Sequence, residues 1–104
     1  MDLESHEAHG AAYFTADFWR ILNDDEIDVV SICSPDSTHY KYAIEGLKAE
    51  RHALVEKPMA TTIEQCREIT SAVETSRGIF GVHHQMRYVP SFPRLLTHVE
   101  ANTR

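Results

Sequence analysis

The chain has 104 residues, 42% of them hydrophobic and 25% charged, which fits one soluble globular domain and is too short for two. No run approaches the roughly 18 apolar residues of a membrane span, and the acidic N-terminus lacks the pattern of a secretory signal. The net charge of −6, without a cluster of Lys and Arg, argues against nucleic acid and anionic membranes as partners.

The first elements are short. Residues 1–12 have the composition of a helix end that Gly10 would stop. A short amphipathic helix is predicted over 16–23, because its apolar residues recur at i, i+3 and i+4. Thr15 is its expected N-cap.

A strand and a helix follow. Ile27–Cys33 is nearly all apolar or β-branched and too short for a helix, which is typical of a strand buried on both faces of a parallel sheet. Pro35 ends this strand, and Asp36 or Ser37 is expected to cap a helix over 38–49.

The second half repeats the pattern. A strand over 52–56 precedes a helix whose start, Thr62–Gln65, fits a capping box, and Gly78 is its expected C-cap. A third strand over 79–82 and a last helix over 94–101 complete the chain. Alternating strands and helices with short connections predict an α/β fold with a parallel sheet.

Cysteines and histidines do not suggest a metal centre. Cys33 and Cys66 lack CxxC spacing, so we expect neither disulfide nor zinc site, but core thiols and a reducing cytoplasm as localisation. His83 and His84 are adjacent on a strand and point to opposite faces, which prevents them from sharing one ion.

Polar motifs follow each of the three strands. They are Ser34-Pro35-Asp36 with His39, then Glu56-Lys57-Pro58, then Met86-Arg87-Tyr88 with Pro90. Over roughly residues 10–100 this series resembles the Gfo/Idh/MocA (glucose-fructose oxidoreductase / inositol dehydrogenase) family of NAD(P)-dependent oxidoreductases. The family's first motif has Thr-Pro-Asn where this chain has Ser34-Pro35-Asp36.

The resemblance implies a partial NAD(P)-binding Rossmann domain over 1–104, the carboxyl half of its parallel sheet. The chain has four glycines and no Gly-x-Gly-x-x-Gly turn, so the first βαβ unit and the C-terminal substrate domain are expected to be absent. In the strand order 3-2-1-4-5-6, Ile27–Cys33 then has an exposed apolar edge. We therefore expect the chain to be marginally stable alone, with a homo-oligomer as one option.

The resemblance also implies roles for the middle motif. Lys57 would lie beside the nicotinamide and the substrate hydroxyl, where it donates to a developing alkoxide or relays its proton. Glu56 would accept hydrogen bonds from the nicotinamide ribose, and Pro58 would fix the turn that aims Lys57, through a cis or a trans peptide bond. The alternatives are a solvated lysine and a strand-end carboxylate paired with a nearby Lys or Arg.

The outer motifs would contribute to cofactor binding. Ser34-Pro35-Asp36 would line the dinucleotide cleft through its backbone, or simply cap a helix. His39 would lie near that cleft, and a helix-surface histidine is nearly as good a reading. Gln85 and Arg87 would lie at the mouth of the site, although Arg87 fits an inter-domain ion pair equally well.

Two functions of different classes remain open. One is a fragment, itself inactive, of an oxidoreductase that uses NAD or NADP on a secondary alcohol of a sugar, cyclitol or similar small molecule. The other is a non-catalytic remnant or interaction module. The residue that would select NAD or NADP follows a strand that this sequence does not contain.

Overall fold

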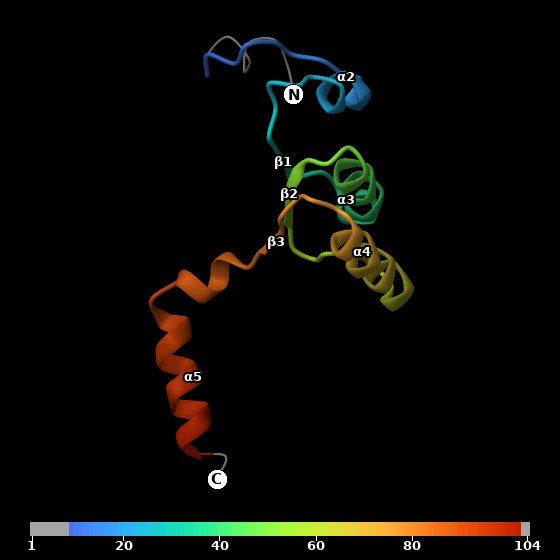
Figure 1. Ribbon diagram of the computed structural model, residues 1–104. Coiled ribbons are helices and arrows are strands. Elements are labelled where there is room, and N and C mark those ends of the chain that lie inside the picture. Colours follow the sequence, from blue (N-terminus) through green and yellow to red (C-terminus); the bar gives the residue numbers. More distant parts are fainter. Residues whose placement is uncertain (1–8, 103–104) are drawn as a thin grey trace.

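The computed structural model describes residues 9–102, in which three parallel strands form one sheet and two helices cover one of its faces (Figure 1). In chain order the elements are α2 (Phe18–Leu22), β1 (Val29–Ile32), η1 (Asp36–Thr38), α3 (His39–Lys48), β2 (His52–Glu56), α4 (Ile63–Thr75), β3 (Phe80–His83), η2 (Gln85–Tyr88) and α5 (Ser91–Asn102). The sheet order is β1-β2-β3. This confirms the predicted α/β fold. Of the helix end predicted over 1–12, residues 1–8 lie outside the described residues, and Gly10, its expected stop, has a left-handed φ of 67°.

The core forms between the sheet and the helices α3 and α4. In the parallel register, Val30 pairs with Ala53 and Ile32 pairs with Val55, so these side chains point to the same face. The buried apolar cluster consists of Leu22, Val30, Ile32, Ala43, Leu47, Val55 and Ile69. Complete burial of a Val, Leu or Ile side chain contributes roughly 1.5–3 kcal/mol to the stability of the fold.

The second face of the sheet is open. Val29 is 56% exposed, Leu54 42% and Ile79 73%, because no helix within residues 9–102 covers them. The prediction of a first strand buried on both faces was therefore wrong, since β1 alternates exposed and buried residues. Cys33 is likewise exposed rather than a core thiol.

Two helix starts differ from the predicted ones. Asp17, not Thr15, caps α2, because its carboxylate accepts the Trp19 N–H at 3.0 Å while Thr15 accepts the N–H of Asp17. The residue before α3 is Thr38, which makes no side-chain capping bond. A 3-10 turn over Asp36–Thr38 takes up the residues that were expected to cap this helix.

Gly78 has a different role from the predicted C-cap. It does not take a left-handed conformation, and Ser76 ends α4 in extended backbone. A Cβ at Gly78 would lie 2.3 Å from the carbonyl oxygen of Arg51, so only glycine allows this close approach of two chain segments. The left-handed residue nearby is Glu50, with φ of 60°, between α3 and β2.

The molecule is extended for its length. Its radius of gyration is 17.0 Å, against about 13 Å for a compact domain of this size. Figure 1 shows why: α5 projects away from the sheet, and its Leu95, Leu96 and Val99 are exposed. Within the described residues, no helix has the length and apolar character to cross a bilayer.

Candidate functional site

The three predicted motifs lie at one edge of the sheet. β1, β2 and β3 are parallel, so the segments that follow Ile32, Glu56 and His83 leave the sheet on the same side. In open α/β sheets this carboxyl edge is where ligands bind. The topology therefore brings together residues that are up to about fifty positions apart in the sequence.

His39 is a buried residue that contacts both the segment after β1 and the segment after β2. Its side chain is 1% exposed, its Nε2 lies 2.8 Å from the carbonyl oxygen of Ser34, and its Nδ1 lies 2.7 Å from that of Pro58. The reading as a helix-surface histidine was wrong, because the first turn of α3 lies beneath both loops. Both ring nitrogens face protein carbonyl oxygens. A polar contact between this ring and a cofactor would therefore require the loss of one of these two contacts.

The turn that follows β1 is held by hydrogen bonds of the Ser34 and Thr38 hydroxyl groups. The Thr38 hydroxyl lies 2.6 Å from the Ser34 hydroxyl and 2.6 Å from the carbonyl oxygen of Pro35. The Thr38 N–H also donates to Pro35 at 2.9 Å. These bonds fix the turn around Pro35 and leave the Asp36 side chain exposed.

Lys57 extends into solvent at the end of β2. Its side chain is exposed, whereas Glu56 and Pro58 on either side are half-buried. The peptide bond between Lys57 and Pro58 is cis. No ion pair within residues 9–102 involves the Lys57 ammonium. The group is thus placed at the strand ends and is available to a ligand.

Glu56 pairs with a residue that the sequence reasoning did not assign to the site. The two residues are partners in the β2–β3 register, and His83 Nδ1 lies 2.9 Å from Glu56 Oε2. The pair is partly exposed, with 48% of the His83 side chain and 30% of the Glu56 side chain accessible. Both residues end parallel strands, which is the signal that could have predicted their contact.

Gln85 and Arg87 continue beyond β3. Both lie in the 3-10 turn η2 with exposed side chains, and the Arg87 N–H donates to the carbonyl oxygen of His84. No hydrogen bond within the described residues joins either side chain to Lys57 or to the Ser34 turn. Their predicted place at the mouth of the site stays a prediction.

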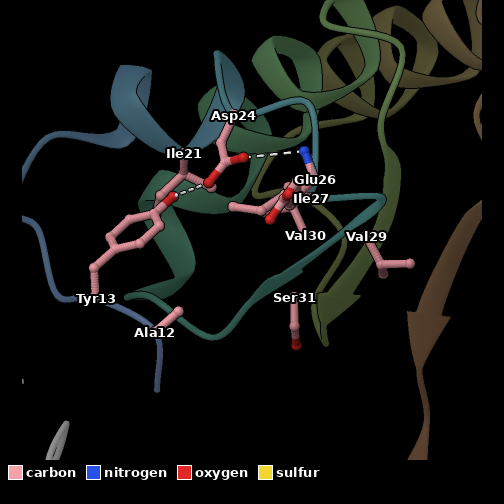
Figure 2. Close-up of a pocket in the computed structure, with 9 residues that line it drawn as sticks. All are labelled: Ala12, Tyr13, Ile21, Asp24, Glu26, Ile27, Val29, Val30 and Ser31. Atoms are coloured by element: carbon pink, nitrogen blue, oxygen red, sulfur yellow. Dashed lines mark hydrogen bonds between the residues drawn. The ribbon is translucent and has the colours of Figure 1, made fainter.

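A cavity of about 470 Å³ lies elsewhere, along the free edge of β1 (Figure 2). Asp24 accepts hydrogen bonds there from the Glu26 N–H at 3.0 Å and from the Tyr13 hydroxyl at 2.9 Å. These two bonds lower the pKa of Asp24. The pKa of Tyr13 is raised, mainly by desolvation and to a smaller extent by the hydrogen bond to Asp24. None of the predicted site residues lines this cavity.

Comparison with known proteins decides the family. The family model described as "Oxidoreductase family, NAD-binding Rossmann fold" (Gfo/Idh/MocA) matches residues 3–84, most of the chain. The chain belongs to the Gfo/Idh/MocA family. Its sheet is accordingly part of a nicotinamide-dinucleotide-binding Rossmann fold, as the three motifs predicted.

Named relatives and a solved structure agree with this assignment. Inositol 2-dehydrogenase 2 of Saccharopolyspora erythraea is 34% identical over 87 residues, covering 83% of this chain and 25% of that protein. Inositol 2-dehydrogenase of Rubrobacter xylanophilus is 34% identical over 95 residues, covering 86% and 27%. An oxidoreductase structure from Bacillus cereus superposes with a TM-score of 0.82 at 30% identity, covering 97% and 29%. The chain thus spans little more than a quarter of these proteins.

Among residues 9–102, no group of three or more His, Cys, Asp or Glu side chains could hold a metal ion. The polar groups at the strand ends include one carboxylate–histidine pair, the exposed Lys57 ammonium and the backbone of the Ser34 turn. A carboxylate suits ribose hydroxyls and an ammonium suits an alcohol oxygen. This donor and acceptor set fits the nicotinamide half of a dinucleotide.

Proposed function

We propose that these residues form the nicotinamide side of the active site of an NAD(P)-dependent oxidoreductase. The whole enzyme would oxidise a secondary alcohol of a cyclitol, sugar or similar small molecule to a ketone, or run the reverse reduction. The observation that carries the proposal is the exposed Lys57, at the carboxyl edge of a sheet that belongs to this family. Two relatives named inositol 2-dehydrogenase support the substrate class.

Lys57 is the residue to which we assign the chemistry. When bound beside these residues, a nicotinamide would supply the hydride acceptor or donor for the reaction. Lys57 Nζ would hydrogen-bond the substrate oxygen and pass the hydroxyl proton to solvent, so that the alcohol loses one proton together with the hydride; in the reverse reduction Nζ would return that proton to the oxygen. A positioned ammonium of this kind stabilises the charge that develops on that oxygen.

Glu56 is assigned to the ribose next to the nicotinamide. Its Oε2 is hydrogen-bonded to His83 Nδ1. Its Oε1 makes no hydrogen bond within the described residues and can accept hydrogen bonds from ribose hydroxyls. Ser34-Pro35-Asp36 would contribute backbone contacts along the dinucleotide, with Gln85 and Arg87 at the mouth of the site. His83 would orient the Glu56 carboxylate.

The 104 residues by themselves are proposed to be inactive. Their sequence contains no Gly-x-Gly-x-x-Gly turn to hold the pyrophosphate. Titration of this chain with NAD and with NADP should therefore give no saturable signal below the millimolar range. Tight binding by this chain alone would contradict the proposed inactivity. We place the parent enzyme in a reducing cytoplasm, because both cysteines are free thiols.

The oxidoreductase assignment is tested with a longer protein that contains these residues and a complete Rossmann domain. It is incubated with NAD or NADP and a panel of cyclitols and sugars, and the formation of reduced nicotinamide is measured. Turnover of at least one secondary alcohol is the expected result. A longer protein that binds neither cofactor and turns over no member would support the alternative, a non-catalytic interaction module.

A further inference from the structure

We propose that His39 is a positioning residue, which ties the turn after β1 to the turn after β2 and so fixes where Lys57 lies. The catalytic meaning of this link rests on the proposed function of Lys57. The link itself is a property of these 104 residues and can be tested without cofactor or substrate.

The burial of His39 requires an explanation. Within residues 9–102 it is the one polar or charged side chain that is fully buried, at 1% exposure. Buried polar groups persist where they find hydrogen-bond partners, and the two ring nitrogens of His39 have one each. An aliphatic residue could fill the same space, so the polarity of the ring is the feature to be explained.

The two partners belong to different loops. One is the carbonyl oxygen of Ser34, five residues before His39, and the other is that of Pro58, nineteen residues after it. A neutral ring donates to one of these oxygens and a charged ring donates to both. Only a ring with both nitrogens protonated hydrogen-bonds both loops at once; a neutral ring keeps one of the two bonds. In both forms the rigid, buried ring lies between the two carbonyl groups, so it sets the distance between them.

This bridge acts on the residue next to Lys57. Pro58 directly follows Lys57, so a fixed Pro58 carbonyl restrains the backbone from which the lysine side chain leaves. No ion pair within the described residues restrains that side chain, which leaves the backbone as the means of aiming it. His39 therefore holds Lys57 in place without contacting the substrate.

Two other roles for His39 do not account for its contacts. It does not cap α3, because the capping position is Thr38 and no side-chain bond is made there. It is not merely an apolar filler, because that role would leave the alignment of both nitrogens with backbone carbonyls unexplained. The bridge accounts for its burial and for both hydrogen bonds.

The test is ¹⁵N relaxation of the backbone in a longer protein that contains these residues and a complete Rossmann domain, without NAD, which reports a separate order parameter for each amide. His39→Leu removes both donors and keeps an apolar side chain, and His39→Gln keeps one donor group. His98→Leu, at an exposed histidine of α5, is the matched control.

In His39→Leu, the order parameters at Ser37 and Lys57 should fall together, from about 0.85 to below about 0.6. The amides of Ala43 and Leu47, in the core part of α3, should not change. His39→Gln should give intermediate values, and the control should match the unsubstituted chain.

Three results would overturn the proposal. The first is unchanged order at both loops in His39→Leu, which would make the ring a filler. The second is an equal loss at the loops and the α3 core, in His39→Gln as well as His39→Leu, which would indicate a contribution to global stability alone. The third is low order at both loops in the unsubstituted chain. None of these readouts depends on NAD, so failure of the proposed function would be recognised separately.

Discussion

Asp24 is the carboxylate whose surroundings lower its pKa most clearly among the described residues. The Glu26 N–H is the main cause, and the Tyr13 hydroxyl adds to it. A carboxylate with a lowered folded-state pKa stabilises the fold above its unfolded pKa, near 4, and this stabilisation is lost as the pH falls through the folded value. Asp24 therefore contributes to the acid dependence of stability.

Replacement of Asp24 by Asn should remove this part of the acid dependence. At pH 7 the variant should unfold at a lower temperature than the unsubstituted chain, and the two should converge as the pH falls through the lowered pKa of Asp24. Thermal unfolding followed by circular dichroism at several pH values measures this. Asp28→Asn, at an exposed carboxylate for which no such hydrogen bonds are present, is the control. A difference that persists at low pH would contradict the assignment.

The Glu56–His83 pair should matter more for binding than for folding. Exposed ion pairs contribute about 0–1 kcal/mol, and both side chains are partly solvated. His83→Leu should therefore change the unfolding free energy by less than about 1 kcal/mol in a denaturant titration. In a longer parent enzyme, the same variant should raise the KM for the cofactor. A large loss of stability with unchanged KM would show that the pair is structural.

At the scale of elements, alanine substitutions at two glycines should change the free energy of unfolding in opposite directions. A Cβ at Gly78 would meet the Arg51 backbone at 2.3 Å, whereas one at Gly46, inside α3, would meet nothing within 4 Å. Gly78→Ala should destabilise the fold by about 1–3 kcal/mol, because backbone must shift. Gly46→Ala should stabilise it by up to about 1 kcal/mol, because alanine favours a helix. Urea unfolding of both variants measures the two effects, and equal effects would refute the packing argument.

The elements show how far the sequence could predict this structure. Apolar periodicity placed all three strands and the helix over Ile63–Thr75 to within a few residues. It could not predict that Thr38 precedes α3 or that Gly78 lies against Arg51, because these depend on contacts between distant segments. The motifs predicted the edge of the candidate site. The burial of His39 and its two carbonyl partners depend on the packing of α3 beneath two loops, for which one sequence carries no local signal.

At the scale of the whole molecule, both edges of the sheet, β1 and β3, are unpaired within residues 9–102, and one of its faces is uncovered. β1 is an edge strand beside a cavity, Val29 and Leu54 are exposed on the open face, and the radius of gyration is 17.0 Å. Unprotected edge strands pair with other chains. The isolated chain should therefore self-associate as its concentration rises.

Sedimentation at several concentrations and thermal unfolding test this expectation together. Association should strengthen with concentration, and Val29→Lys should weaken it, because charge on an edge strand opposes pairing. Lys48→Ala, at the end of α3, is a control away from that edge. A monomer at all concentrations with one cooperative transition would show that the chain is a self-sufficient domain.

The most direct test of the account is the effect of Lys57→Ala on kcat in a longer parent enzyme with a complete Rossmann domain. We predict a decrease of about 10²–10⁴-fold, the usual contribution of a positioned acid–base group, with cofactor binding and the thermal midpoint nearly unchanged. Lys48→Ala should retain full activity. A Lys57→Ala enzyme that keeps its kcat would contradict the claim that this strand end carries the chemistry.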